Sequence, residues 1–156
     1  LRAKHTCELA ELFPPFEIES DLTEWDNGTD EGRTPEEIHA ERPEWNLYRD
    51  GSPQGETPDG IAARADRVIT HLKTLQGNIA LFSHGHFLRV LSTRWIGQAV
   101  TSAQHLILDP ASLSILCYEH GDSDMPAIEL WNSATQTSAT AEEHVHERSR
   151  TQPITR

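Results

Sequence analysis

Apolar and polar residues alternate with the period of a helix most clearly between Thr57 and Gly77. Six apolar residues recur there at spacings of mostly three or four: Ile61, Ala65, Val68, Ile69, Leu72 and Leu75. This spacing places them on one face of an α-helix. Thr57 is a favourable N-cap, Pro58 suits the first helical position, and Gly77 is a typical stop. The pattern therefore predicts a long amphipathic helix.

The next stretch, residues 78–97, combines two patterns. Residues 79–82 are continuously apolar, which is typical of a strand buried on both faces in a parallel sheet. Helical spacing follows in a second apolar set: Phe87, Val90, Leu91 and Trp95. Gly97 is well placed to end that helix. We therefore predict a strand, a tight turn at residues 83–86, and a helix.

Two shorter helices are predicted nearer the N-terminus. Apolar positions within residues 1–13 form a helical stripe, which Pro14 and Pro15 end. Thr34, Pro35 and Glu37 form a capping-box signature, so a short helix begins there and stops before Pro43.

The remaining segments are shorter or less regular. Four predicted strands cover residues 16–19, 106–108, 112–118 and 127–131. Residues 44–60 are rich in Pro and Gly, and a long loop of this kind is a candidate active-site lid. Residues 133–156 lack periodicity, so we expect one domain over residues 1–132 followed by a mostly disordered tail.

Composition restricts the class of function. The 156 residues carry a formal net charge of −12, which argues against a nucleic-acid partner and requires any anion site to be local. No apolar run reaches membrane-spanning length, so no membrane partner is expected. The two cysteines are far apart and outside any Cys-x-x-Cys pair, which favours a reducing compartment and hence a cytoplasmic location.

The predicted turn at residues 83–86 is the clearest candidate site. It places His84 beyond the carboxyl end of a strand and beside the free N–H groups of a helix N-terminus, where anionic ligands bind in α/β folds. An imidazole can hydrogen-bond or transfer a proton near neutral pH. Gly85 is small and leaves room for a ligand.

Two further residues fit an anion site. Arg2 offers a planar donor fork suited to phosphate. Glu24 lies beside Trp25, and partial burial would raise its carboxyl pKa so that it holds a proton near neutral pH. An arginine, an acid and His84 that converge on a helix N-terminus suit phosphoryl transfer.

Each of these residues also has a purely structural interpretation. Arg2 taken alone fits a surface arginine, and Glu24 is one of 25 acidic residues. His84 and His86 could form a metal pair, but residues 87–89 supply no further ligand, so the metal interpretation is the weaker one.

Taken together, the motifs resemble the histidine phosphatase superfamily, whose fold is phosphoglycerate mutase-like. The matching segments are Leu-Arg-Ala-Lys-His-Thr at 1–6, Leu-Thr-Glu-Trp-Asp-Asn-Gly at 22–28 with Glu-Gly at 31–32, Gly-Glu-Thr at 55–57, and Phe-Ser-His-Gly-His-Phe-Leu-Arg at 82–89. Their order and spacing cover about residues 1–132. The resemblance implies a three-layer α/β/α sandwich with a mainly parallel sheet and the His84 strand near its centre.

The resemblance also implies a mechanism. In the family, a histidine of an Arg-His-Gly motif attacks phosphorus, arginines and a second histidine hold the oxygens, and a carboxylic acid protonates the leaving group. Carried over, Arg2 is a phosphate clamp, Glu24 is the proton donor, and His84 is the second histidine, with Gly85 beside the phosphate. His86 and Arg89 are neighbours. No cofactor is implied, and the expected ligand is phosphate or a small phosphorylated metabolite.

The sequence departs from the family at its nucleophile. No Arg-His-Gly occurs in the 156 residues, although the family places this motif on a first strand ahead of the helix that begins this sequence. We therefore expect an N-terminally truncated member with little or no activity, and an unpaired sheet edge that could drive dimerisation. The alternatives are a non-catalytic relative that binds phosphate and a metal hydrolase that uses His84 and His86.

Overall fold

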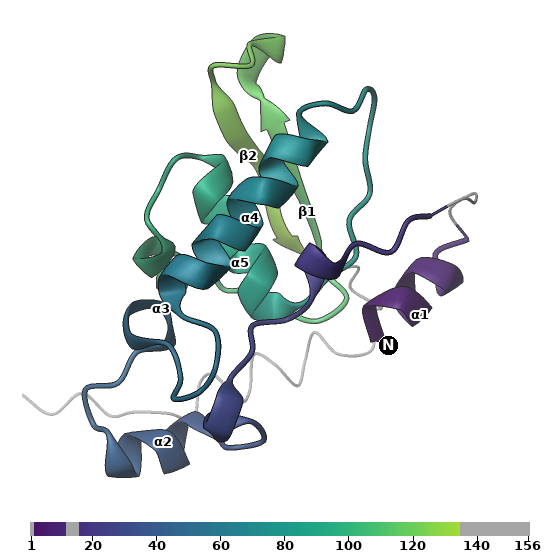
Figure 1. The fold of residues 1–156 in the computed structure, drawn as a ribbon. Helices are drawn as coiled ribbons and strands as arrows, with labels where there is room; N and C mark the ends of the chain where they lie inside the picture. Colours follow the sequence, from purple (N-terminus) through teal and green to yellow (C-terminus); the bar gives the residue numbers. More distant parts are fainter. Residues whose placement is uncertain (1, 12–15, 135–156) are drawn as a thin grey trace, which may run out of the picture.

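A computed structural model describes residues 2–11 and 16–134. The α-helices are α1 (Arg2–Leu9), α2 (Pro35–Glu41), α3 (Leu47–Asp50), α4 (Pro58–Leu72) and α5 (Gly85–Trp95). Short 3-10 helices are η1 (Ser20–Leu22), η2 (Gly28–Asp30), η3 (Val100–His105) and η4 (Glu119–Gly121). The strands are β1 (Leu113–Tyr118) and β2 (Pro126–Ser133). Helices α4 and α5 pack against each other, and the two strands lie beside α5 (Figure 1).

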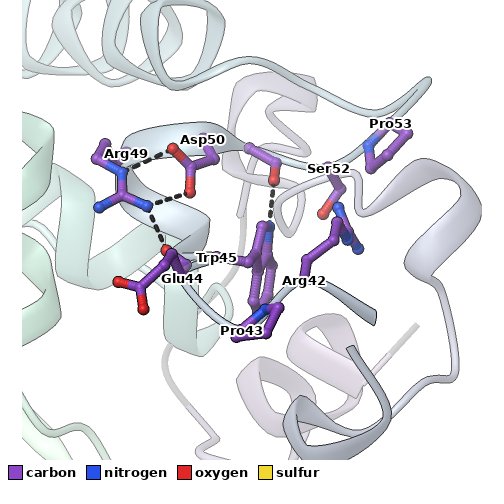
Figure 2. A pocket seen from close by; sticks show the side chains of 9 residues that line it. Arg42, Pro43, Glu44, Trp45, Arg49, Asp50, Ser52 and Pro53 are labelled. Atoms are coloured by element: carbon purple, nitrogen blue, oxygen red, sulfur yellow. Dashed lines mark hydrogen bonds and ion pairs between the residues drawn. The ribbon is translucent and has the colours of Figure 1, made fainter. Parts of the chain in front are cut away.

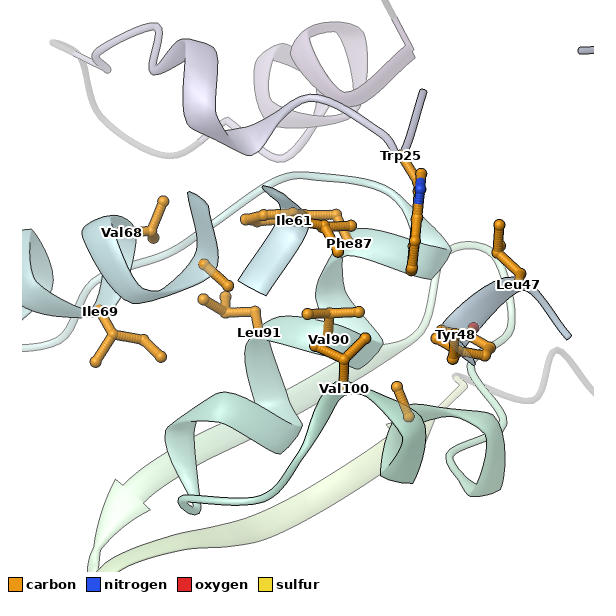
Figure 3. Close-up of a cluster of buried hydrophobic side chains, with 12 residues drawn as sticks. Trp25, Leu47, Tyr48, Ile61, Val68, Ile69, Phe87, Val90, Leu91 and Val100 are labelled. Atoms are coloured by element: carbon orange, nitrogen blue, oxygen red, sulfur yellow. The ribbon is translucent and has the colours of Figure 1, made fainter. Parts of the chain in front are cut away.

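The core forms where the apolar faces of α4 and α5 meet. It contains Trp25, Leu47, Tyr48, Ile61, Ala65, Val68, Ile69, Phe87, Val90, Leu91, Val100 and Ala103 (Figure 3). Ile61, Phe87 and Val90 are fully buried. Each such side chain contributes about 1.5–3 kcal/mol through its removal from water. The helical spacing seen in the sequence therefore identified the residues that hold the two helices together.

The predicted helix ends are confirmed at three places. Thr57 Oγ1 accepts a hydrogen bond from the Gly60 N–H at 3.1 Å, at the start of α4. Thr34 and Glu37 exchange the two hydrogen bonds of a capping box at the start of α2. Gly97 follows α5 with a φ of +72°, a left-handed conformation that glycine adopts without strain.

The sheet consists of β1 and β2 paired antiparallel. Leu116 lies opposite Ile128, and the register shifts on both sides of Ile115. The indole N–H of Trp95, at the end of α5, lies 3.1 Å from the Cys117 carbonyl and 3.2 Å from that of Ala127. These contacts fix the sheet against α5. The strands β1 and β2 confirm two of the five predicted strands.

The other three strand predictions were wrong. Residues 16–19, 79–82 and 106–108 form no strand. The backbone of residues 78–83 makes no hydrogen bond to any described residue, and Ile79 remains 40% exposed. A strand exists only through hydrogen bonds to a neighbour, so an apolar run alone does not create one. Within residues 2–11 and 16–134 the sheet is therefore antiparallel, and His84 does not follow a central parallel strand.

Two further expectations concern less regular segments. Residues 44–60 contain the short helix α3, where the sequence indicated only a loop. The predicted tail lies almost entirely outside the described residues. The first helix ends at Leu9, earlier than the predicted end at Pro14 and Pro15, which lie outside the described residues. No helix in the described part of the chain has the length and apolar character needed to cross a bilayer.

Candidate active site

The carboxylate of Glu24 lies at the N-terminus of α5. Its Oε1 accepts hydrogen bonds from the backbone N–H groups of Trp25 at 2.9 Å and Phe87 at 3.0 Å. Its Oε2 lies 3.4 Å from the backbone nitrogen of His86 and 3.7 Å from that residue's Nδ1. The first N–H groups of a helix have no partner within the helix and carry partial positive charge. Glu24 therefore occupies the position where the sequence predicted an anion.

These contacts reverse the pKa expected for Glu24. Burial raises the pKa of Glu24. Hydrogen bonds from His86 and from the backbone N–H groups of Trp25 and Phe87 lower it by more, so the resulting pKa is about 2. The prediction that burial would keep Glu24 protonated near neutral pH is therefore wrong for this structure. The hydrogen bonds outweigh burial because they stabilise the charged form directly.

His84 and Gly85 lie at the same end of α5. His84 is the N-cap residue, with extended backbone angles, and its carbonyl accepts the Leu88 N–H at 2.9 Å. Its half-buried imidazole makes no hydrogen bond to a described residue. A Cβ placed on Gly85, the first residue of the helix, would meet no atom within 4 Å. The space beside these two residues is therefore open.

Arg2 is not joined to this group in the described part of the chain. It lies on α1, which buries none of its residues and stands at the periphery of the molecule (Figure 1). The Arg2 carbonyl accepts a hydrogen bond from Thr6 within the helix, but the guanidinium bonds to no described residue. Its role as a phosphate clamp stays a prediction.

The sequence interpretation missed the pair formed by Arg64 and Glu56. The Arg64 guanidinium donates to both carboxylate oxygens of Glu56, at 2.9 and 2.6 Å, and to the carbonyls of Asp21 and Thr23 at 2.8 and 2.7 Å. A signal was present, because Arg64 precedes Ala65 on the apolar face of the predicted helix. A buried arginine requires such partners.

His86 and Arg89 adjoin the site from α5. The His86 ring lies 6.1 Å from the ring of Tyr48, and Arg89 stacks over the Tyr48 ring at 4.8 Å. Arg89 also donates to the carbonyls of Ala103 and Gln104 at the end of η3. Burial raises the pKa of Tyr48 to about 12, against an opposing effect of Arg89. Arg89 thus ties α3, α5 and η3 together.

The candidate lid packs on the loop that carries Glu24. The Trp25 indole N–H donates to the Glu56 carbonyl at 2.8 Å, and the Glu56 N–H donates to the Asp26 carbonyl at 2.8 Å. Gly28 and Gly55 approach so closely that a Cβ on either would lie 2.3 Å from backbone atoms of the other segment. Residues 51–56 therefore pack against the loop that carries Glu24 and do not form a free lid above it.

A shallow groove of about 510 Å³ lies on the far side of that segment (Figure 2). It is lined by Arg42, Pro43, Glu44, Trp45, Arg49, Asp50, Gly51, Ser52 and Pro53. Arg49 forms an ion pair with Asp50, and Arg42 forms one with the buried Asp30. Both cationic charges are thus already balanced, and neither Glu24 nor His84 lines this groove.

The two histidines of the alternative metal site lack a third ligand. Among residues 2–11 and 16–134, no three His, Cys, Asp or Glu side chains gather closely enough to hold a metal ion. A protein zinc site needs at least three protein ligands. The described geometry gives the metal interpretation no support.

Known proteins resemble this chain over most of its length. Residues 1–134 match the family profile described as histidine phosphatase superfamily (branch 1). An acid phosphatase of Mycobacterium tuberculosis is 33% identical over 131 residues, which cover 83% of this chain and 64% of that protein. A sedoheptulose 1,7-bisphosphatase of Saccharomyces cerevisiae is 29% identical, over 83% of this chain and 69% of its own. This chain thus spans less than two thirds of the acid phosphatase.

Solved structures show the same fold. The product of an open reading frame of Mycobacterium tuberculosis superposes with a TM-score of 0.78 at 30% identity, over 85% of this chain and 68% of that one. An α-ribazole phosphatase from Shigella flexneri gives a TM-score of 0.69 at 26% identity, over 87% and 72%. The α/β, phosphoglycerate mutase-like fold class is thereby confirmed. With its matching profile, relatives and fold, this chain belongs to the histidine phosphatase superfamily.

Proposed function

We propose that this chain supplies the acid and the second histidine of a phosphomonoester hydrolase that acts on a small phosphorylated metabolite. The observation that carries the proposal is the position of the Glu24 carboxylate, 3.0 Å from the Phe87 N–H at the helix end that His84 caps. Helix N-termini bind phosphate, and phosphoryl transfer depends mainly on positioning and charge neutralisation. The phosphatase names of the two curated relatives support the same reaction class.

In the proposed reaction, a nucleophilic histidine forms a bond to phosphorus while the bond from phosphorus to the ester oxygen breaks. Glu24 gives its proton to that oxygen, and His84, Gly85 and Arg2 hold the transferred group. A water molecule then attacks phosphorus, the phosphohistidine bond breaks, and Glu24 takes up the water proton. Phosphate leaves, and the histidine and Glu24 return to their starting states.

The low pKa of Glu24 fits this role only if the bound ligand changes it. A phosphate dianion at the N-terminus of α5 would compete for the N–H groups that Glu24 now accepts, and its charge would repel the carboxylate. Both effects raise the pKa of Glu24 from about 2. Binding of substrate would therefore protonate the acid at the moment when a proton donor is needed.

The activity of the 156-residue chain by itself depends on whether it contains the nucleophilic histidine. Since the 156 residues contain no Arg-His-Gly, we expect very slow hydrolysis of p-nitrophenyl phosphate by this chain. A version extended at its N-terminus by a strand that carries Arg-His-Gly should hydrolyse it. Glu24→Gln and His84→Ala in the extended version should lower kcat, whereas Glu129→Gln, a change at an exposed position of β2, should not. Equal turnover with and without the added strand would refute the proposal.

The absence of Arg-His-Gly also favours a second function, phosphate binding without catalysis. The open space beside Gly85 and the N–H groups of α5 could receive a phosphate in either case. Thermal unfolding at increasing inorganic phosphate distinguishes the two functions. A rise in Tm together with no turnover in the extended version would favour a binding protein.

A further inference from the structure

The Arg64 guanidinium is enclosed by α4, α5 and the acid loop, which we define as residues 22–32. Arg64 is 8% exposed. Nε and Nη2 bind the two oxygens of Glu56, and Nη1 binds the carbonyls of Asp21 and Thr23. The other hydrogen of Nη2 points to the Glu24 carbonyl, 3.4 Å from the nitrogen. An arginine has five N–H donors, so every one of them has an acceptor.

Arg64 also contacts the helix that receives the Glu24 carboxylate. Its Cζ lies 4.5 Å from the ring centre of Phe87. The backbone N–H of Phe87 donates to Glu24 Oε1 at 3.0 Å. The Arg64 guanidinium therefore contacts both partners of the hydrogen bond between Glu24 and Phe87: the backbone of Glu24 and the side chain of Phe87.

Glu56, in the segment before α4, binds both Arg64 and the acid loop. Its carboxylate forms an ion pair with Arg64 at 2.6 Å, which balances the buried charge. Its own backbone binds the acid loop twice, through the Asp26 carbonyl and the Trp25 indole. Arg64 thus binds the carbonyls of Thr23 and of Asp21, which immediately precedes the acid loop, and the backbone of Glu56 binds Trp25 and Asp26.

We propose that Arg64 is a positioning residue that holds the Glu24 carboxylate against the N-terminus of α5. The planar fork of an arginine binds Glu56 in two places while its other nitrogen bridges two carbonyls, and the single ammonium of a lysine cannot satisfy all of these acceptors. The consequence for catalysis rests on the proposed function, in which Glu24 handles the proton. The positioning itself does not, because it is argued from contacts within the chain that involve no substrate.

The pKa of Glu24 depends on where its carboxylate lies, so a measured pKa tests that position. The other ionisable groups that face it are His86 on α5 and Tyr48 on α3, and Arg64 approaches its carbonyl from α4. A carboxylate that moves away from the N–H groups of His86 and Phe87 loses the hydrogen bonds that favour its charged form. Its pKa must then rise, whereas a general loss of stability would leave the pKa of the folded state unchanged.

The experiment is a 13C NMR titration of the Glu24 carboxyl in the 156-residue chain, with the signal assigned by its loss in Glu24→Gln. The Arg64→Lys variant should show a Glu24 pKa raised by about one unit or more. The matched control is Arg67→Lys, because the exposed Arg67 lies on the same helix and donates to the two carboxylate oxygens of Asp21 but not to Glu24 or Glu56. The control should leave the Glu24 pKa as it is.

A second variant covers the case in which Arg64→Lys does not fold. Glu56→Gln keeps the side-chain shape and Arg64 itself, but removes the charge that orients the fork. It should raise the Glu24 pKa by a smaller amount in the same direction. A folded Arg64→Lys or Glu56→Gln chain with an unchanged Glu24 pKa would overturn the proposal. Because no substrate is used, that result would leave the proposed phosphatase function standing.

Discussion

The Oε1 atom of Glu24 accepts a hydrogen bond from the backbone N–H of Phe87 at 3.0 Å, across 63 residues of sequence. The contact places the acid of the predicted site directly on the helix N-terminus that was predicted to bind an anion. In this structure, the carboxylate is itself the anion at that position. A phosphate ligand would therefore have to share or displace these hydrogen bonds, which couples ligand binding to the protonation of Glu24.

Replacing Glu24 by Gln should destabilise the fold. The amide can accept hydrogen bonds, but it lacks the charge that makes the contacts with the N–H groups of α5 strong. We expect a loss of about 1–2 kcal/mol in the free energy of unfolding, measured by urea denaturation. Glu129→Gln, an exposed change on β2, should alter it by less than about 0.5 kcal/mol. Equal stability of the two variants would contradict the prediction.

The same carboxylate should make stability depend on pH. The pKa of Glu24 is about 2 in the folded chain against an ordinary value of 4.5. A lowered folded-state pKa contributes stability that is fully present above the unfolded value and is lost as the pH falls from 4.5 toward about 2. Asp50, whose pKa is also lowered to about 2 mainly by its hydrogen bond from Arg49, acts in the same direction.

Urea denaturation at several pH values tests this dependence. The free energy of unfolding of the parent chain should fall steadily below about pH 4.5, and Glu24→Gln should fall less steeply, since only the Asp50 part and other carboxyls remain. Parallel curves for the two chains would show that Glu24 does not titrate as the structure implies.

Gly55→Ala should destabilise the contact between the acid loop and residues 51–56. A Cβ there would lie 2.3 Å from the Asp26 carbonyl oxygen and 2.8 Å from the Gly28 nitrogen, so the backbone must move. We expect a loss of about 1–3 kcal/mol in unfolding free energy, the usual cost of overpacking. Gly85→Ala, whose Cβ meets no atom within 4 Å, is the matched control and should change stability little.

The apolar segment at residues 79–82, which is exposed at Ile79 and Ala80, should promote association between chains. Its backbone has no hydrogen-bond partner among the described residues, and Ile79 is 40% exposed. Unpaired extended backbone with apolar side chains is a template for strand pairing. Light scattering should show mass increasing with concentration, and Ile79→Lys should reduce this increase. A monomer of constant mass at all concentrations would disprove the expectation.

Local patterns were sufficient for the helices α2, α4 and α5, but not for the short α3. The capping box at Thr34, the N-cap at Thr57 and the stop at Gly97 act through neighbours a few residues away, so the sequence contains both partners of each interaction. The strand predicted at residues 79–82 failed for the opposite reason. A strand requires a partner from elsewhere in the chain, and apolar character cannot specify whether that partner is there.

The same distinction between local and long-range interactions applies to the site. His84 was identified from its own surroundings, because an anion site at a helix N-terminus is a local feature. The pKa of Glu24 was predicted in the wrong direction, since burial is suggested by the neighbouring Trp25 but the N–H donors come from α5. Arg64 was missed because two of its acceptors, the carbonyls of Asp21 and Thr23, lie 43 and 41 residues away in the sequence. Its place on an apolar helix face was visible.

The sequence by itself determined most of the helices and the apolar faces that form the core, and it predicted Glu24 as the acid and His84 as the second histidine. These depend on spacing, capping and motif, which are read along the chain. Only the tertiary structure decided that the Glu24 carboxylate accepts N–H groups at the start of α5, that these hydrogen bonds lower its pKa, and that Arg64 pairs with Glu56 beside the acid loop. Those properties depend on distances between residues far apart in sequence, because hydrogen bonds and charges act over a few ångströms in space.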